Sequence, residues 1–430
     1  MKATKFSLFS FMLFFVMVSS YCIRKQSVQL SIVPDEDNAG LTLPEGFSSL
    51  IVADNLGSGR HIAVNKNGDI YLALRSLNNG NGIVALRDTN GNGRADLIRY
   101  FGKTLTTGID INNGFLYYSN FNEVFRTALS PDDLVPEGEQ VVIVTGFPVQ
   151  YQHQDKTFAL DNAGYLYVNV GAPSNACQVR DRTPGSPGMD PCPLLERHAG
   201  IWRFRADLPG QDQMADGLRY ASGIRNSIAL AWNFSNDKLY VVQHGRDQLY
   251  QLFPDLYTEQ EGAELPAEEF FLVENGDYFG WPYCYYDQLK KQKILAPEYG
   301  GDGKAIGRCT DAKDPIMVFP GHLAPNDLLF FKGNTFPEKY RNGAFIAFHG
   351  SWNRTPLPQE GYYVAFVPFK NGLPLGDWEI FANGFAGTDV IKSPGDAVYR
   401  PMGLAQGPDG SLYVSDSEKG RIWRIIYTKK

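Results

Sequence analysis

The sequence predicts an all-β fold, a six-bladed β-propeller with long inserted loops roofing one face. A turn-and-strand pattern recurs six times, at an average spacing of about 68 residues, which suits one four-stranded blade with its connections. Long amphipathic helical stretches are scarce. Their scarcity argues against a doubly wound α/β fold, because that fold needs a helix after nearly every strand.

Each copy of the pattern is a polar turn followed by a short apolar strand. Gly and Asn supply the positive φ angles that tight hairpins need, and the Leu-Tyr-Val cores suit the buried middle of a sheet. Each copy therefore predicts one hairpin. The six copies are KNGDIYLAL (66–74), NNGFLYYSN (112–120), NAGYLYVNVG (162–171), SNDKLYVVQHG (235–245), RNGAFIAFHG (341–350) and GPDGSLYVSD (407–416).

The amino terminus has the layout of an export signal. Two lysines precede an apolar run from Phe6 to Val18, which is too short for an ordinary membrane span. Cys22 follows directly and would permit a lipid-anchored amino terminus; the alternative is a soluble secreted protein. We therefore expect a signal over 1–22, a flexible tether over 23–40 and the propeller over 41–430, in the periplasm or outside the cell.

The four other cysteines lie in the two longest insertions, between residues 171 and 219 and between residues 245 and 320. An exported compartment permits disulfides, and proximity in sequence favours pairing within each insertion. The spacing does not resemble a zinc site. The alternative is that some are free buried thiols. The expected pairs are Cys177 with Cys192 and Cys284 with Cys309.

The charge balance argues against a nucleic-acid partner. The chain has 40 Lys and Arg against 47 Asp and Glu, a formal charge of -7, and no basic block beyond its last two residues. Proteins that bind nucleic acid concentrate positive charge on one surface.

The segment 88–96 resembles the start of an EF-hand calcium loop. Its alternate positions carry the residues that such a loop would use, with Gly93 at the sharp turn. Arg99 stands where a full loop has its bidentate glutamate. A polar hairpin turn is the alternative interpretation. The candidate ligand positions are Asp88, Asn90, Asn92, Arg94 and Asp96.

Histidines and arginines stand at the ends of the predicted strands. Because neighbouring blades converge on the propeller axis, His153, His244 and His349 could meet there, and one could act as a general base. Several arginines in the same register would suit a polyanionic ligand, since guanidinium groups bind carboxylates bidentately. Hydrogen-bonded structural histidines and a surface salt-bridge network are the alternatives.

An ordered set of motifs then resembles the glucose/sorbosone dehydrogenase family, in its sorbosone and pyranose dehydrogenase branch. The likeness runs from Leu43 to Arg424. It implies a six-bladed propeller that uses pyrroloquinoline quinone (PQQ) and calcium. The motifs are HQ at 153, VG at 170, GIRN at 223, HGRDQL at 244, FGWPYC at 279, HLAP at 322, HGSWNR at 349 and RPMGLAQGPDGSLYVSD at 400.

The resemblance implies roles for residues on two of these motifs. His153 would take the proton from the sugar C1 hydroxyl as hydride leaves C1 for the quinone, a role suited to a pKa near neutrality. Arg225 would face the quinone oxygen that gains negative charge. Asn226 and Gln154 would hold the cofactor.

Other residues would form the rest of the implied cofactor site. The main-chain carbonyls of Gly245 and Arg246 would bind the calcium ion on the cofactor. Arg354 and Arg400 would bind the PQQ carboxylates. The further candidates for the same ring of contacts are Arg60, His349 and Asn353.

Two residues depart from the soluble glucose dehydrogenases. Ala172 replaces an aspartate that supports the base, so His153 needs another orienting partner. Val398 replaces a second cation near the last blade. Both changes leave PQQ binding expected and weaken the tie to glucose.

The expected function is PQQ-dependent oxidation of an aldose or related sugar aldehyde. No Cys-x-x-Cys-His haem motif occurs, so electrons would pass to a separate quinone or cytochrome acceptor. Two alternatives belong to other classes. One is a calcium-dependent lactonase-type hydrolase, and the other is a non-catalytic propeller that binds carbohydrate or protein.

Overall fold

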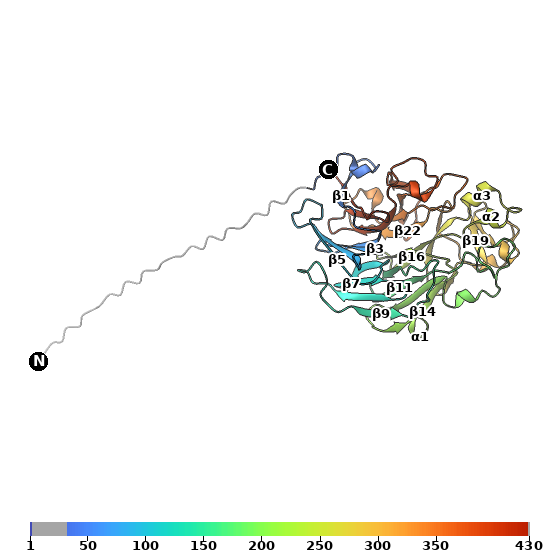
Figure 1. The fold of residues 1–430 in the computed structure, drawn as a ribbon, viewed down its shortest axis with the longest axis horizontal. Coiled ribbons are helices and arrows are strands. Elements are labelled where there is room, and N and C mark those ends of the chain that lie inside the picture. Colours follow the sequence, from blue (N-terminus) through green and yellow to red (C-terminus); the bar gives the residue numbers. More distant parts are fainter. Residues whose placement is uncertain (2–31, 429–430) are drawn as a thin grey trace.

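The computed structural model describes Met1 and residues 32–428, and the six larger sheets of this part of the chain form the six-bladed β-propeller that the sequence predicts (Figure 1). The chain visits the blades in order. The first strand of each blade lies against the first strands of neighbouring blades, so these six strands surround the axis. The predicted export signal and Cys22 lie outside the described residues, apart from Met1.

The first three blades follow one another along the chain, each with its strands in antiparallel order from the axis outward. Their strands are β2 (Gly59–Val64), β3 (Ile70–Asn78), β4 (Asn81–Arg87) and β5 (Leu97–Phe101); β6 (Ile109–Asn112), β7 (Phe115–Ser119), β8 (Val124–Ala128) and β9 (Val141–Thr145); and β10 (Phe158–Leu160), β11 (Tyr165–Val170), β12 (Gly200–Arg205) and β14 (Leu218–Ser222).

The last three blades have the same order, except that the sixth takes its outer strand from the start of the chain. Their strands are β15 (Ala229–Asn233), β16 (Lys238–Gln243), β17 (Glu268–Val273) and β21 (Met317–Phe319); β22 (Pro325–Phe330), β23 (Ala344–Phe348), β24 (Tyr363–Val367) and β27 (Glu379–Ala382); and β28 (Pro401–Gln406), β29 (Leu412–Asp416), β30 (Ile422–Tyr427) and β1 (Phe47–Ala53).

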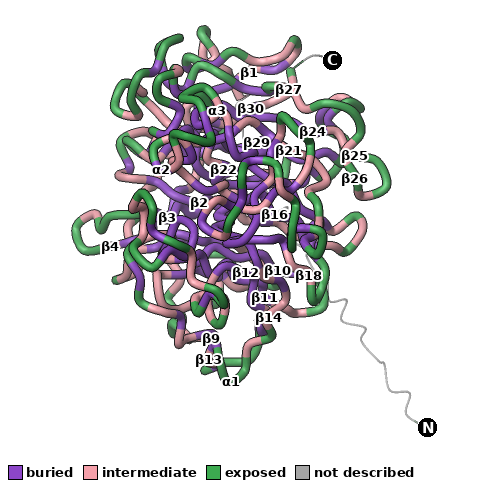
Figure 2. The backbone as a smooth tube through the Cα atoms, turned by 90° about the vertical axis from the view of Figure 1, so that its right-hand side faces the viewer, coloured by how far each residue is buried: buried purple, intermediate pink, exposed green. Residues whose placement is uncertain are grey.

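The predicted repeats coincide with one place in every blade. Each copy supplies the turn after the first strand and then the second strand, namely β3, β7, β11, β16, β23 and β29. Gly68 and Gly410 take φ angles of 91° and 83° in two of these turns, in the region that favours glycine. The second strands are mostly buried because each lies between two others and faces a neighbouring blade on either side (Figure 2).

The ring is closed by pairing the first strand of the chain with the last. β1 runs antiparallel to β30, and Figure 1 shows β1 beside the carboxyl terminus. The Phe47 ring on β1 packs edge-on against Phe336 and Phe381, with centroids 4.8 and 5.0 Å away. Aromatic contacts of this kind add to the burial of apolar surface. Phe47 therefore ties the last blade to the one before it.

The described part of the expected tether, residues 32–40, packs against the propeller. Asp35 forms an ion pair with Arg94 at 2.7 Å, and the Ala39 carbonyl accepts a hydrogen bond from the Trp423 indole at 3.1 Å. A short 3₁₀ helix, η1 (Asn38–Gly40), lies here. The expectation of a flexible segment up to residue 40 is therefore wrong for these residues, because buried and charged groups hold them.

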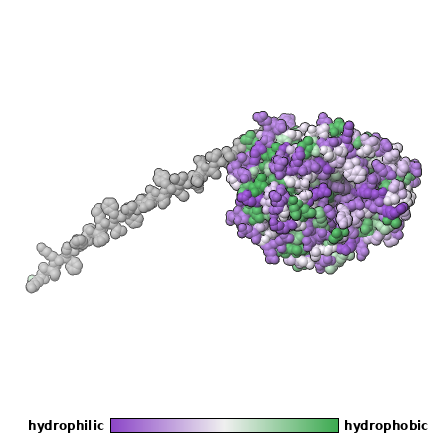
Figure 3. Space-filling model, in the orientation of Figure 1, coloured by the Kyte–Doolittle hydropathy of each residue, from purple (hydrophilic) through white to green (hydrophobic). Residues whose placement is uncertain are grey.

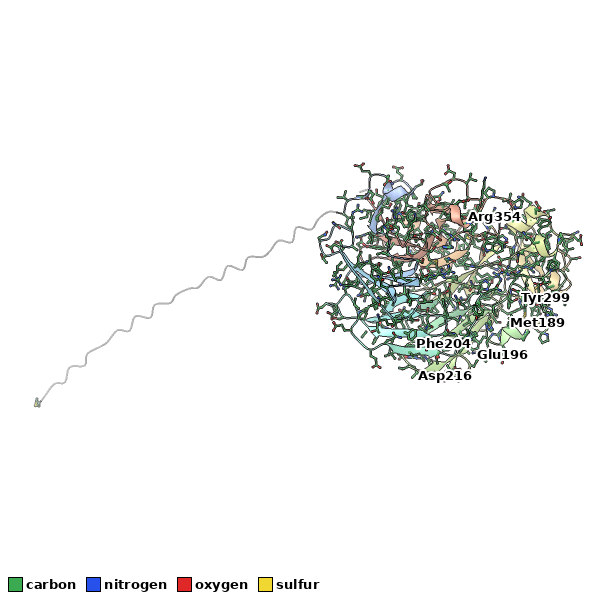
Figure 4. All side chains as sticks on the ribbon, viewed as in Figure 1. Met189, Glu196, Phe204, Asp216, Tyr299 and Arg354 are labelled. Atoms are coloured by element: carbon green, nitrogen blue, oxygen red, sulfur yellow. A yellow bond between two sulfur atoms is a disulfide. The ribbon has the colours of Figure 1, made fainter. Side chains whose placement is uncertain are left out.

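The two insertions pack together as a roof on one face, and both predicted disulfides are present. Cys177 bonds to Cys192, and Cys284 bonds to Cys309. Trp281 donates its indole N–H to the Asn175 carbonyl at 2.9 Å, which joins the second insertion to the first. Figure 4 labels Met189 and Tyr299 beside each other where the insertions meet, and both pack against the disulfides.

The remaining elements are short. They are α1 (Gln213–Asp216), α2 (Leu249–Leu252) and α3 (Glu259–Glu264); β13 (Gln211–Asp212), β18 (Asp277–Tyr278), β19 (Cys284–Asp287), β20 (Gln292–Leu295), β25 (Phe369–Lys370) and β26 (Leu373–Pro374); and η2 (Pro193–Glu196), η3 (Pro297–Tyr299), η4 (Gly307–Asp311), η5 (Glu338–Tyr340) and η6 (Pro394–Asp396).

The face drawn in Figure 3 is mainly hydrophilic, with its apolar patches gathered on the side where β1 and β5 lie. In the part of the chain that the structure describes, no helix has the length and apolar character needed to cross a membrane.

Replacing Phe47 by alanine should weaken ring closure. Phe47 is 5% exposed, so the variant leaves a cavity between the last two blades. We expect the free energy of unfolding to fall by about 3–5 kcal/mol in denaturant titrations. Leu375→Ala is the control, because Leu375 is 56% exposed and its loss should change stability by less than about 0.5 kcal/mol. Equal effects of the two substitutions would contradict this account of closure.

Candidate active site

Side chains from different blades meet where the axial strands begin, beneath the roof. Arg60 opens β2 and forms an ion pair with Asp155, which precedes β10. Arg400 precedes β28 and donates to the carbonyls of His349 and Gly350 at 3.1 and 2.5 Å. The structure therefore brings together residues that are hundreds of positions apart in sequence.

His153 lies on the loop between β9 and β10 and is oriented by a backbone carbonyl. Its Nδ1 lies 2.6 Å from the Ala172 carbonyl oxygen. A carbonyl only accepts, so Nδ1 carries the proton and Nε2 carries a lone pair. Gln150 fixes the loop by donating to the His153 and Gly171 carbonyls at 2.8 and 3.0 Å. Ala172 thus supplies the orienting partner through its main chain, in place of the missing carboxylate.

The His153 pKa is not near neutrality, contrary to the sequence-based expectation. Burial and, to a lesser extent, the nearby positive charge of Arg225 lower it to about 3, against the opposing effect of the Ala172 carbonyl. Burial likewise lowers the pKa of His244 to about 4 and that of His349 well below its usual value. The three axial histidines are therefore neutral at physiological pH.

Arg225 holds a buried positive charge next to His153. It is 2% exposed, and its guanidinium donates to the Gly245 carbonyl at 2.7 Å and to the Asp247 carboxylate at 2.8 Å. Asn175, on the roof, accepts a further bond from Arg225 Nε at 3.2 Å. A buried cation needs such partners to offset the loss of hydration.

Asp247 is the centre of this network, and the sequence interpretation did not assign it a role. Its carboxylate also pairs with Arg182 at 2.8 Å and accepts a bond from Asn353 at 2.9 Å. Burial alone would raise its pKa, but Arg225 and Arg182 together hold the pKa well below its usual range. The sequence feature that could have indicated a role for Asp247 is its position in HGRDQL, directly after the candidate calcium residues Gly245 and Arg246.

Gly245 and Arg246 differ in how they face the site. The Gly245 carbonyl points to Arg225, and its N–H donates to Glu268 at 2.7 Å. The Arg246 side chain leaves the axis and forms a buried ion pair with Glu298 in the roof. Burial raises the pKa of Glu268 to about 8. The Arg246 side chain is therefore engaged with the roof, and calcium binding by the main-chain carbonyls of Gly245 and Arg246 stays a prediction.

Close packing around Gly171 positions Asn226 beside His153. A Cβ on Gly171 would lie 2.6 Å from Asn226 Oδ1 and 2.7 Å from His153 Cβ, so no larger residue fits. Asn226 is 1% exposed and accepts a bond from Asn169 at 3.2 Å. Gln154 is half-buried, and its carbonyl accepts a bond from Lys156 at 2.6 Å.

The remaining predicted cofactor contacts fall into two groups. Asn353 reaches the central carboxylate of Asp247, and His349 Nε2 lies 2.7 Å from the Ser417 hydroxyl. Arg354 instead donates to the Ala263 and Gly321 carbonyls at 3.3 and 3.1 Å, next to α3 (Figure 4). Its guanidinium is thus already engaged with the roof.

The segment 88–96 forms the turn between β4 and β5, on the outer strands of the first blade and away from the axis. Asp88 accepts bonds from the N–H groups of Gly91, Asn92 and Gly93, at 2.8, 3.2 and 2.7 Å. Asp96 accepts a bond from the Thr89 hydroxyl at 2.7 Å. These bonds are those of a polar hairpin turn, and calcium binding there stays a prediction.

A protein-family model described as TrAA12-like matches residues 41–428. The chain belongs to the TrAA12-like family. An uncharacterized protein of Borreliella burgdorferi is 30% identical over 212 residues, 49% of this chain and 48% of that protein, so the match spans about half of its length. The pyrroloquinoline quinone-dependent sugar dehydrogenase of Hypocrea jecorina is 24% identical over 409 residues, 88% of this chain and 87% of that protein.

A solved structure supports the architecture. The holo form of the pyranose dehydrogenase PQQ domain from Coprinopsis cinerea superposes with a TM-score of 0.72 at 19% identity, covering 90% of this chain and 97% of that chain. At that identity the likeness establishes the fold. The residues of the axial cluster all lie within the part of the chain that the TrAA12-like model matches.

Replacing Asp247 by asparagine should leave Arg225 and Arg182 without their shared counter-charge. We expect a loss of about 3–5 kcal/mol of unfolding free energy at neutral pH. The pKa of Asp247 in the folded state lies below the unfolded value of 3.8. The stabilisation that its carboxylate provides is therefore complete above pH 3.8 and is lost as the pH falls below that value. Denaturant titrations from pH 7 to about pH 2.5 should show the two proteins converging in acid. A constant difference over that range would contradict the role of the Asp247 charge.

Proposed function

We propose that this chain oxidises an aldose or related sugar aldehyde by hydride transfer to PQQ. The observation that carries the proposal is the pairing of a neutral His153, with its Nε2 lone pair available, and the buried cation of Arg225. A base and a fixed positive charge side by side are what removal of a hydride and a proton from an alcohol requires. The names of the Hypocrea and Coprinopsis relatives support the same chemistry.

The cluster fits a ligand that carries carboxylates. Arg60 is 6% exposed, and within the described residues its Nε atom is buried without a hydrogen-bond partner. The Arg400 guanidinium lies at the same end of the axis. Its Nη1 atom is 3.6 Å from Oε1 of the Glu418 carboxylate. We assign Arg60 and Arg400 to the PQQ carboxylates. Arg354 would have to exchange its carbonyl partners to take part.

The calcium position fits hard oxygen donors. The Gly245 carbonyl oxygen accepts a bond from Arg225 at 2.7 Å, and the Glu268 carboxylate accepts one from the Gly245 N–H at 2.7 Å. Carbonyl and carboxylate oxygens are the ligands that Ca²⁺ prefers. We assign Gly245 and the Arg246 main chain to the ion, whose charge would balance the cofactor's carboxylates.

The protein's own residues then have separate tasks. His153 accepts the sugar hydroxyl proton at Nε2, while the Ala172 carbonyl keeps the ring in place. Arg225 presents a fixed cation where negative charge develops. The roof, joined to Arg225 through Asn175, excludes water from the cleft. PQQ, when bound, supplies the two-electron acceptor that no side chain provides.

The electrons must leave the protein, and we propose a separate quinone or cytochrome as acceptor. We also place the enzyme outside the cytoplasm, since two disulfides persist best in an oxidising compartment. The hydrolase alternative lacks support. Within the described residues, no three His, Cys, Asp or Glu side chains are grouped to hold a metal ion.

The His153→Ala variant should retain PQQ and lose turnover. Purified protein is mixed with PQQ and Ca²⁺, passed through gel filtration, and assayed by dye reduction with a panel of aldoses. We expect quinone absorbance on both proteins and a fall of about 10²–10⁴-fold in kcat for the variant, since only the base is removed.

His198→Ala serves as the control because His198 lies in the first insertion, just before β12, and its pKa is lowered mainly by burial, with no contribution from Arg225 or Asp247. It should keep the parent rate. Absence of quinone absorbance on the parent protein would refute the dehydrogenase assignment, and full activity of His153→Ala would refute the role of His153.

A further inference from the structure

A second cavity occupies the opposite end of the propeller axis. Its volume is about 450 Å³, and it is lined by the axial strands of all six blades. Its lining starts inside the strands and continues past their ends, from His61 to Lys66 along β2 and from Asp327 to Lys332 along β22. The catalytic candidates His153 and Arg225 instead precede the axial strands β10 and β15. The cavity is therefore a separate site.

The deep end of this cavity holds an unpartnered histidine nitrogen. His61 is 7% exposed, and its Nδ1 lies 3.1 Å from the Thr107 carbonyl oxygen, so Nδ1 carries the proton. In the described structure its Nε2 is buried and has no hydrogen-bond partner. A buried lone pair without a donor is costly. Asp327 Oδ1 lies 3.6 Å from this nitrogen, and a carboxylate only accepts when ionised.

Two carboxyl groups lie in the same cavity. Asp327 is 7% exposed and accepts bonds from the N–H groups of Leu328 and Leu404, at 2.8 and 2.7 Å. Asp110 accepts a bond from the Ile111 N–H at 2.7 Å. Among the described residues, neither carboxylate is within ion-pair distance of a lysine or arginine. Burial raises the pKa of Asp110 to about 6 and that of Asp327 to about 8.

The walls and the mouth have different chemistry. Lys66 and Lys332 are exposed and stand at the strand ends, where the cavity opens. Lys332 Nζ lies 3.5 Å from the centre of the Phe234 ring, so its charge is held against that ring. At about 3.3 Å per residue, Lys66 is about 16 Å along the strand from His61. The apolar walls between the two ends include Ile62, Val64, Phe158, Leu160, Leu230, Trp232, Leu328 and Phe330.

We propose that this cavity binds a small organic ammonium ion with an apolar body. The ammonium group would donate to His61 Nε2 and to the carboxylates of Asp327 and Asp110, all of which accept. The apolar body would lie against the hydrophobic walls. A neutral alcohol could satisfy His61 but would bring no counter-charge to Asp327, and would leave Asp110 with only the more distant charge of Lys332. An anion would meet them with repulsion.

The test compares three probes of one shape on the intact protein by isothermal titration calorimetry. These are 2-phenylethylammonium, 2-phenylethanol and 3-phenylpropanoate. We expect the ammonium to bind at least about tenfold more tightly than the alcohol and the carboxylate not to bind. Equal binding of ammonium and alcohol, or no binding of any probe, would overturn the proposal and leave a water-filled channel.

Binding of the ammonium should also depend on pH. The groups that line the cavity are His61, Asp110, Asp327 and, at the mouth, Lys66 and Lys332. The charges of Arg60 and Asp155 also act on His61 at the deep end. Affinity should rise by about tenfold or more between about pH 5.5 and pH 8.5, since both carboxyl groups ionise in that interval while the ammonium stays charged. Affinity that is constant or falls over that interval would contradict the proposal.

The Asp110→Asn variant tests whether the probe binds in this cavity. It removes the negative charge, while the asparagine amide oxygen can still accept the bond from the Ile111 N–H. We expect about a tenfold loss of ammonium affinity and no change for the alcohol. Asp389→Asn, on an exposed loop outside the cavity, should behave as the parent. Unchanged affinity in Asp110→Asn would place the probe elsewhere and refute the assignment. If that variant does not fold, the probe comparison on the parent protein still decides.

Discussion

The buried charge of Arg225 is the constraint on which the site depends. A guanidinium that is 2% exposed is retained only if its charge is matched, and Asp247 supplies that match. Asp247 also binds Arg182 on the first insertion and Asn353 after the fifth blade's β23. One carboxylate therefore connects the roof to the propeller. Burial and the same cation both lower the pKa of His153, so the charge that the fold must neutralise also helps to keep the base neutral.

Convergence of the axial strands explains why the two ends of the propeller axis differ chemically. At their starts, the strands bring cationic loops together beneath the roof, around Arg60, Arg225 and Arg400. Further along the axis, the lining becomes apolar and carries His61 with two carboxyl groups. The closure of the ring by β1 and β30 holds both ends at a fixed width. Ligand chemistry at each end follows from which strand positions face the axis.

The six blades could be predicted from the sequence because each repeat combines turn residues with one buried strand. Both disulfides could be predicted because the paired cysteines are close in sequence. The axial position of His153 and Arg225 also followed from strand ends. The directions in which the loop side chains point could not be predicted from the sequence. Arg246 points into the roof, Arg354 binds carbonyls there, and Asp247 went unassigned. Those outcomes depend on loop conformations stabilised by contacts between distant segments, which no local pattern encodes. The pKa of His153 depends on burial in the same loops.

The central claim is that His153 acts as a base that is already neutral. The most direct test is the pH dependence of kcat/KM with PQQ and Ca²⁺ bound, measured in brief assays between about pH 3 and pH 8. Because the pKa is lowered to about 3, the base form persists in mild acid, and the rate should fall only as pH approaches that value. An acid limb with its midpoint between about pH 6 and pH 7, the range of an ordinary histidine, would contradict the account.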